Sequence, residues 1–325
     1  MMSGDTSLTG PSTLHDEAFF DLESLELGLD FMVRRCLAQD RSQVLLDAPR
    51  AVDASARSTV PVAGVWCRSL REDLSIRWTD RAAVVAVRLD DGAAVAGRVI
   101  PWKQSTNESL PDDDDPGEGH AADGFVCDLR ARTSMPWDGG TWAITVLLAG
   151  YASQTVFTHV SGAPSRPLAA PSPPTTDARF PSYRPSPGTP AVPRAHGVAM
   201  DPARVVVLTP DVRCVLTGSF RLPASMHLAA PEGSIAHDAP CARVVPLTVV
   251  STRDDALEPH AVTLNVPCDG PTDEGDVTGV FAVDLFELAE FSRQPGEVRL
   301  WAFAGHFVEG PFPMELVSED ELAPK

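Results

Sequence analysis

The chain has 325 residues, 43% of them hydrophobic, and its 26 Lys and Arg against 45 Asp and Glu give a formal net charge of -19. This charge excludes a general nucleic-acid binder, because counterion release from a duplex requires a basic surface. The hydrophobic content excludes a wholly disordered chain, and the length suits about two domains. The 30 Pro and 23 Gly indicate a chain rich in turns.

The N-terminal part carries no targeting signal that we can recognise. Residues Met1 to Glu17 have neither a basic region nor an apolar run, and no stretch of the chain approaches the roughly 20 apolar residues of a membrane span. We therefore expect a cytoplasmic protein that contacts no membrane. The six cysteines form no C-x-x-C pair, so we interpret them as buried thiols. Nearly all the positive charge is Arg, which hints at a GC-rich bacterial genome.

Residues 1–50 are predicted to be an N-terminal segment with a disordered start and an amphipathic docking element. Between Asp16 and Leu37, apolar residues recur every three or four positions, which favours a helix. The same stretch also alternates from Leu25 to Val33, as a strand would, and Gly28 weakens a helix. Both readings stay open. In either one the apolar face is too large to remain in water, so it should dock on the first domain or on a partner.

Residues 51–160 are predicted to form a first β-sandwich. Its strands are short, rich in Val, Ile, Thr and aromatic residues, and separated by turn sequences such as Asp90-Asp91-Gly92. The expected strands are 60–67, 83–89, 94–100, 124–129, 142–148 and 155–160.

Residues 161–203 are predicted to be a semi-extended linker. Eleven prolines fall between Pro164 and Pro202. Because proline lacks the amide hydrogen and fixes φ, we expect neither a helix nor a sheet ladder in this stretch.

Residues 204–318 are predicted to form a second β-sandwich, followed by an acidic tail at 319–325. Its expected strands are 204–209, 213–220, 243–251, 261–266, 277–284, 298–304 and 307–317. Part of the sequence of the first sandwich is repeated in the second: Gly124-Phe-Val-Cys-Asp128-Leu129 resembles Gly279-Val-Phe-Ala-Val-Asp284-Leu285. Such a long period indicates a duplicated domain rather than a solenoid. We therefore predict an all-β protein of two tandem antiparallel β-sandwiches, immunoglobulin-like in outline.

An acidic loop in the first sandwich is a candidate ligand-binding site. Asp112, Asp113, Asp114 and Asp115 are followed by Gly117, in a spacing that superficially matches a calcium loop. Pro116 stands where a ligand is expected, and no flanking helix is predicted. We therefore interpret the segment as a solvated loop that attracts a basic partner segment.

Metal ligands are densest in the second sandwich, where His227, His237, Cys241 and His260 are the candidates. His237 and Cys241 are four residues apart in a turn-rich segment that does not fix them on one face, so we favour no metal site and expect no cofactor. Walker, kinase, H-E-x-x-H and G-x-S-x-G signatures are missing from the sequence. The string from Gly117 to Ala122 imitates a dinucleotide loop, but it follows acidic residues instead of a strand and precedes no predicted helix, so we discard it.

Tryptophan gathers in the first sandwich. Trp78, Trp102 and Trp137 fall near predicted strand ends or turns, where an indole can anchor a ligand while staying partly wet. Packing at the edge of the core is the simpler interpretation of the same positions.

These features together predict a non-catalytic peptide- or protein-binding protein. An open sandwich edge has unpaired backbone groups, to which a peptide can add as an extra strand. The acid excess favours partners with basic residues, such as a peptide substrate presented to modifying enzymes. A metal-dependent hydrolase or oxygenase and a carbohydrate-binding module are the alternatives. The sequence leaves the oligomeric state open, including a homo-oligomer.

Overall fold

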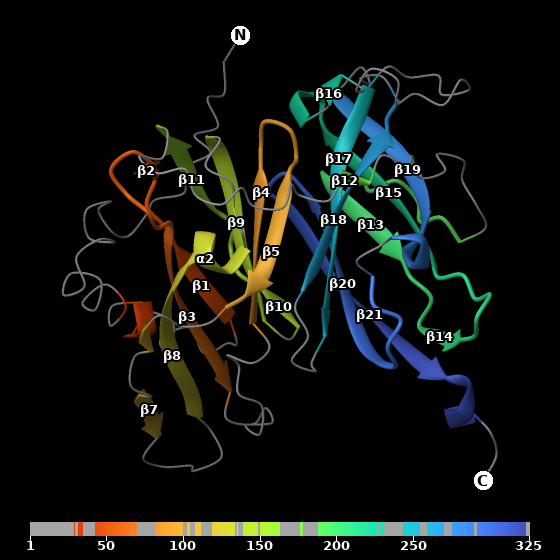
Figure 1. Ribbon diagram of the computed structural model, residues 1–325, viewed down its shortest axis with the longest axis horizontal. Helices are drawn as coiled ribbons and strands as arrows, with labels where there is room; N and C mark the ends of the chain where they lie inside the picture. Colours follow the sequence, from red (N-terminus) through yellow and green to blue (C-terminus); the bar gives the residue numbers. More distant parts are fainter. Residues whose placement is uncertain are drawn as a thin grey trace. The chain divides into compact units, whose positions relative to one another are not determined.

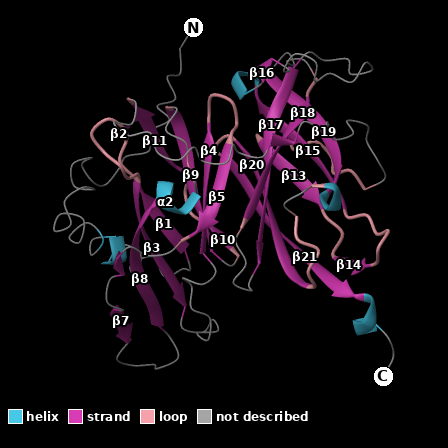
Figure 2. Ribbon diagram, in the orientation of Figure 1, coloured by secondary structure: helices cyan, strands magenta, loops and turns pink. Residues whose placement is uncertain are grey.

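The computed structural model is all-β, with only short helical turns (Figures 1 and 2). It describes residues 29, 32–34, 43–69, 82–99, 103–104, 108–111, 119–133, 135, 139–148, 150–162, 176–177, 188–226, 228–229, 243–253, 259–269, 275–288 and 291–322. The chain divides into two compact units. Unit 1 comprises residues 1–86 and 97–173, and unit 2 comprises residues 87–96 and 174–325.

Unit 1 is built on two sheets. In the first sheet the strand order is β1 (Gln43–Asp47), β3 (Pro61–Ser69), β8 (Gly119–Asp128) and β6 (Lys103–Gln104), and β7 (Glu108–Pro111) also pairs with β8. In the second sheet the order is β2 (Ala51–Asp53), β11 (Val156–Ser161), β9 (Gly140–Leu148), β4 (Ala82–Arg88) and β5 (Ala94–Arg98), and β10 (Tyr151–Ala152) pairs with β9. The end of β4, the turn after it and the start of β5, residues 87–96, are counted with unit 2. A short helix, α2 (Leu129–Thr133), follows β8.

Unit 2 also contains two sheets. Its three-stranded sheet has the order β13 (Gly197–Asp201), β15 (Val215–Pro223) and β19 (Asp276–Asp284). The larger sheet has the order β12 (Thr176–Asp177), β18 (His260–Pro267), β17 (Arg243–Arg253), β20 (Gly296–Ala304), β21 (Phe307–Ser318) and β14 (Val205–Leu208). The strand β16 (Leu228–Ala229) pairs with β17, and three turns of 3-10 helix complete the unit: η3 (Ala224–Met226), η4 (Leu285–Glu287) and η5 (Glu319–Leu322).

The two units share one strand order. The path β1-β3-β8 corresponds to β13-β15-β19, and the path β2-β11-β9-β4-β5 corresponds to β14-β21-β20-β17-β18. Even the unusual parallel pair recurs, because β2 runs parallel to β11 as β14 runs parallel to β21. This is the immunoglobulin-like arrangement. In each unit the chain passes from the smaller sheet to the larger one between two consecutive strands, from β1 to β2 and from β13 to β14.

A capping aspartate repeats at the same place in each unit. The Asp128 carboxylate accepts hydrogen bonds from the amides of Val60 and Arg130, at 2.9 and 3.2 Å. The Asp284 carboxylate accepts from the amides of Cys214 and Phe286, both at 3.0 Å. In both units the aspartate thus ties the end of one strand to the start of its neighbour, and it stabilises the turn that follows.

A glycine facing a phenylalanine also repeats. Gly64 lies opposite Phe125 in the β3–β8 ladder, and Gly218 lies opposite Phe281 in the β15–β19 ladder. Both rings are fully buried, and each fills the space above the glycine on the partner strand. An aromatic ring that covers a cross-strand glycine in this way pins the register of the two strands.

The outer face of the smaller sheet differs between the units. In unit 1 this face is apolar. Leu29, Met32 and Val33, all three helical, pack on it beside Val65 and Val126. These described residues follow the helical reading of the N-terminal segment. In unit 2 the matching positions of β15 are polar (Thr217, Ser219 and Arg221), and the buried Ser219 hydroxyl donates to the Ala191 carbonyl at 3.0 Å. Residues at the end of the linker therefore cover this face.

Several strands differ from the expectation: β1, β13 and six strands of two to four residues, β2, β6, β7, β10, β12 and β16, were not predicted from the sequence. Of these, β12 lies in the predicted linker. β1 lies in the part of the chain that we assigned to the N-terminal segment, and β13 lies in the part that we assigned to the linker. The expectation that no sheet ladder enters residues 161–203 is thus wrong. Gly197–Asp201 contains no proline, so its amides are free to pair with β15. The start of the predicted acidic tail forms η5.

Four cysteines are buried thiols: Cys67, Cys127, Cys214 and Cys268. Burial raises the pKa of the Cys127 thiol to about 12, and burial together with the nearby Asp284 carboxylate raises that of Cys214 to about 12. No helix in the described part of the chain has the length and apolar character needed to cross a membrane.

Candidate strand-binding edges

The strand β19 forms one edge of the three-stranded sheet. Within the part of the chain that the structure describes, β19 pairs only with β15. The carbonyl of Thr278 accepts a hydrogen bond from the Asp269 amide at 2.8 Å, which places this carbonyl on the side away from β15. Because backbone groups alternate between the two sides of a strand, those of Val280 and Ala282 also face away from β15.

The matching edge in unit 1 is filled. There, β6 and β7 add antiparallel to β8, with Lys103 opposite Val126 and Glu108 opposite Ala122. When the two capping aspartates are superposed, Val126 corresponds to Ala282 and Ala122 to Thr278. In an immunoglobulin-like sandwich, β6 and β7 hold the fourth position of this sheet.

The connection that precedes the edge strand explains this difference. In unit 1, residues 99–118 join β5 to β8 and supply both β6 and β7. In unit 2, only residues 268–275 join β18 to β19. This short connection reaches β19 through the Asp269 bond to Thr278 and runs on into the start of β19. In unit 2, Asp269 thus occupies part of the position that corresponds to β7. The position that corresponds to β6, beside Phe281 and Ala282, is held by no described strand.

Polar side chains join all three strands at the beginning of β19. The His196 Nε2 atom lies 2.8 Å from a carboxylate oxygen of Asp276, and Arg221 Nη1 lies 3.5 Å from the other oxygen. Asp276 is almost fully buried by these contacts. The His196 ring packs edge-on against Phe307. This end of the sheet is therefore fixed, whereas Ala282, Val283 and Asp284 at the other end are half-buried.

The strand β18 forms an edge of the larger sheet and already carries an added strand. β12, from the linker, pairs with it in parallel, with Thr176 opposite Thr263 and Asp177 opposite Leu264. On the other side, β18 pairs antiparallel with β17 along its whole length.

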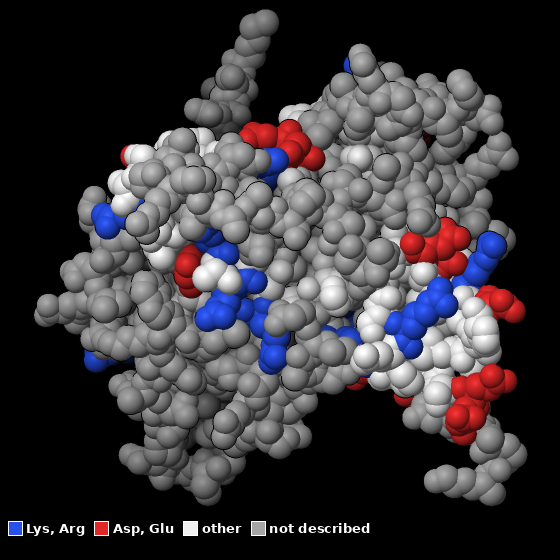
Figure 3. Space-filling model, in the orientation of Figure 1, with Lys and Arg blue, Asp and Glu red and all other residues white. Residues whose placement is uncertain are grey.

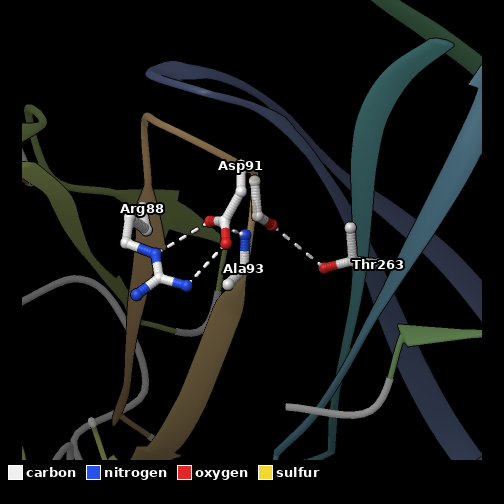
Figure 4. Close-up of polar contacts among 5 residues, drawn as sticks. Arg88, Asp91, Ala93 and Thr263 are labelled. Carbon is white, nitrogen blue, oxygen red and sulfur yellow. Dashed lines mark hydrogen bonds and ion pairs between the residues drawn. The ribbon is translucent and has the colours of Figure 1, made fainter. Parts of the chain in front are cut away.

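Hydroxyl contacts hold β18 at Thr263. Its hydroxyl lies 3.0 Å from that of Thr248, directly opposite on β17, and donates to the Gly92 carbonyl at 3.2 Å (Figure 4). Gly92 has a φ of +73°, and a Cβ there would lie 2.2 Å from the Pro246 Cβ. Only glycine therefore fits the turn that presents this carbonyl.

Asp91 organises the same turn. Its carboxylate accepts hydrogen bonds from Arg88 Nε at 2.8 Å and from the Ala93 amide at 3.0 Å (Figure 4). Partial burial opposes ionisation, but these bonds and the Arg88 charge outweigh it and lower the pKa of Asp91.

Charge is mixed among the described residues of the face drawn in Figure 3. On the face drawn in Figure 3, the described acidic side chains form several separate groups, most of them beside basic side chains. The formal charge of -19 therefore does not appear there as one continuous acidic field.

All but one of the site residues expected from the sequence lie outside the described residues. Trp78, Trp102, Trp137 and the four aspartates Asp112–Asp115 lie outside the described residues, as do His227, His237 and Cys241. His260 is described, at the start of β18. Among the described residues, no group of three or more His, Cys, Asp or Glu is arranged to hold a metal ion. Neither strand edge was predicted from the sequence, although the two units differ in the length of the connection before the edge strand, residues 99–118 against 268–275.

Comparisons with known proteins add little. No protein-family model and no curated protein matches the sequence. Among solved structures, the chain is similar to the C-terminal domain of the Streptococcus pyogenes antigen I/II-family protein AspA, with 10% identity, 85% of this chain and 97% of that chain covered, and a TM-score of 0.19. It is also similar to domains 5-6 of the S-layer protein SbsC, with 10% identity, the same coverage and a TM-score of 0.17. Similarities this low carry no argument about the function of this chain.

Proposed function

We propose that this protein is a non-catalytic binding protein, and that unit 2 takes up an extended peptide or protein segment by strand addition to β19. One observation carries the proposal. The edge that β6 fills in unit 1 has no described strand on it in unit 2, although both units share one strand order. An added segment would run antiparallel to β19, as β6 runs antiparallel to β8.

The backbone groups of Val280 and Ala282 are the main source of affinity in this proposal. They offer about four hydrogen bonds, each worth roughly 1 kcal/mol net. A ligand side chain directed into the sandwich would lie beside Val283, which packs at the margin of the core. Burying one aliphatic side chain there adds about 2 kcal/mol. A total of about 6 kcal/mol corresponds to a Kd between about 1 μM and 1 mM.

The ligand chemistry follows from the strand and from the charge. Side chains alternate across a strand, so every second ligand residue should be apolar where it faces the core. The net charge of -19 favours basic residues at the remaining positions. Binding should therefore weaken as salt is raised, because exposed charges are then screened.

A random 12-residue peptide library displayed on phage tests the proposal. We would select on the wild-type protein and titrate the selected peptides by calorimetry. The variant Ala282→Pro removes an amide that faces away from β15, so the sheet should tolerate it while the edge loses a donor. The matched control Ala282→Ser keeps that amide.

The expected result is binding to wild type and to Ala282→Ser, with at least a tenfold loss in Ala282→Pro. Selected peptides with an N-methyl group on alternate residues should lose binding in one of the two methylation registers only, because only every second ligand amide faces β19. Selected peptides that bind Ala282→Pro as tightly as wild type would refute strand addition at this edge.

A further inference from the structure

The linker contributes a strand to unit 2 through β12. This strand covers only two positions of the eight-residue β18, those of Thr263 and Leu264. Two paired residues form few hydrogen bonds, each worth roughly 1 kcal/mol net. Pairing of so few residues is weak on its own, and the tether that joins β12 to unit 2 strengthens it by raising the local concentration of β12 beside β18.

The strand β18 is a rigid surface for such pairing. Val262, Leu264 and Val266 are buried in the core of unit 2, and Thr263 is held through its hydroxyl by Thr248 and Gly92. A segment that pairs with β18 thus orders only itself, which keeps the entropic cost of binding low.

The sequence around β12 is suited to pairing without a large loss of entropy. Prolines precede it at Pro171, Pro173 and Pro174 and follow it at Pro181. Proline fixes φ near the value of extended chains, and it biases the residue before it toward the extended region. The sequence on either side of β12 therefore favours an extended chain.

We infer that the β18 edge is a second strand-addition site, which the linker strand β12 occupies within the same chain. The site accepts a proline-flanked extended segment that runs parallel to β18 and competes with β12. It differs from the β19 site in strand, in direction and in having an internal occupant, so it does not depend on the proposed function.

A fluorescent synthetic peptide with the sequence of residues 171–181 tests the inference by anisotropy on the full-length protein. The variant Thr176→Pro/Asp177→Pro removes the amides of β12 and should vacate the edge. The matched control Ser172→Pro/Ser186→Pro adds the same number of prolines elsewhere in the linker. We expect the first variant to bind the peptide at least threefold more tightly than wild type, and the control to bind like wild type.

Two further measurements locate the binding. N-methylation of the peptide at the positions of Thr176 and Asp177 should abolish its binding, and Ala282→Pro should leave it unchanged. Equal affinity for wild type and the β12 variant, or no binding to that variant, would overturn the inference. Loss of binding in Ala282→Pro would also overturn it, because the peptide would then occupy β19. Failure of the β19 proposal would leave all these expected results unaltered.

Discussion

Replacing Gly218 by Ala should destabilise unit 2 by about 2 kcal/mol. A Cβ at this position would lie 2.2 Å from Cζ and 2.4 Å from Cε1 of Phe281, and 2.8 Å from the Ala199 carbonyl oxygen. The Phe281 ring is fully buried and cannot turn into solvent, while the Ala199 oxygen belongs to the paired strand β13. Overpacking of this severity costs about 3 kcal/mol. The lower entropy of the unfolded alanine chain returns up to about 1 kcal/mol.

Urea unfolding followed by circular dichroism measures this effect, with the free energy taken from the midpoint and slope. Gly150→Ala is the matched control, because a Cβ there has no atom within 4 Å. Gly64→Ala repeats the perturbation in unit 1, where the Cβ would lie 2.3 Å from Phe125 Cζ.

A double-mutant cycle with Phe281→Leu identifies the cause. The smaller side chain makes room for the new methyl group, so the two substitutions should compensate each other by at least about 1 kcal/mol. If Gly218→Ala is as stable as Gly150→Ala, or if its cost does not change in the Phe281→Leu background, the proposed packing of ring on glycine is wrong.

Three other predictions concern stability and chemistry. Asp284→Ala should cost about 2 to 3 kcal/mol in urea unfolding and Asp284→Asn less, because the amide keeps an acceptor for the Cys214 and Phe286 amides; equal costs would contradict the role of this acceptor oxygen. Cys127 and Cys214, with pKa values of about 12, should react with a thiol reagent at pH 8 only after unfolding, and rapid labelling of either in the native protein would contradict their burial. The folded state lowers the pKa of Asp91 below its ordinary value of 3.8, so the stability it contributes should be present at pH 7 and lost as the pH falls through the lowered pKa. Asp91→Asn should therefore be less stable than wild type at pH 7, with a difference that shrinks as the pH falls below 3.8; a difference that stays constant in acid would argue against this linkage.

Much of the fold could be predicted from local sequence. The echo between Gly124–Leu129 and Gly279–Leu285 contains the two residues that repeat structurally, a buried phenylalanine and a capping aspartate three positions later. Alternating Val, Ile and Thr located most strands because half-buried strands require that pattern.

There are physical reasons why β1 and β13 could not be predicted from the sequence. β1 is short and follows a stretch that fits a helix, and β13 directly follows the prolines of the linker, which obscure a five-residue strand. The outer faces of the two smaller sheets differ, apolar at Val65 in unit 1 and polar at Ser219 in unit 2. This difference could be recognised only after the registers of β3 and β15 were known.

The candidate edges could not be predicted from side chains. A strand edge binds through backbone amides and carbonyls, which every residue except proline carries, so no residue type at Val280 or Ala282 distinguishes an edge from an interior strand. Carboxylates, histidines and tryptophans mark a candidate site in a sequence, whereas the candidate edge in the structure is a position beside β19 that no described strand holds.

Residue-resolved amide hydrogen exchange of the free protein, followed by nuclear magnetic resonance, tests the β19 edge most directly. The amides of Gly279, Phe281 and Val283 face β15 and should exchange slowly, and so should that of Val126, which faces β6. The amides of Val280 and Ala282 should exchange at least a hundredfold faster and become protected when a selected peptide binds. Slow exchange at Val280 and Ala282 in the free protein, equal to that of their neighbours, would show that the edge is already filled and would contradict the account.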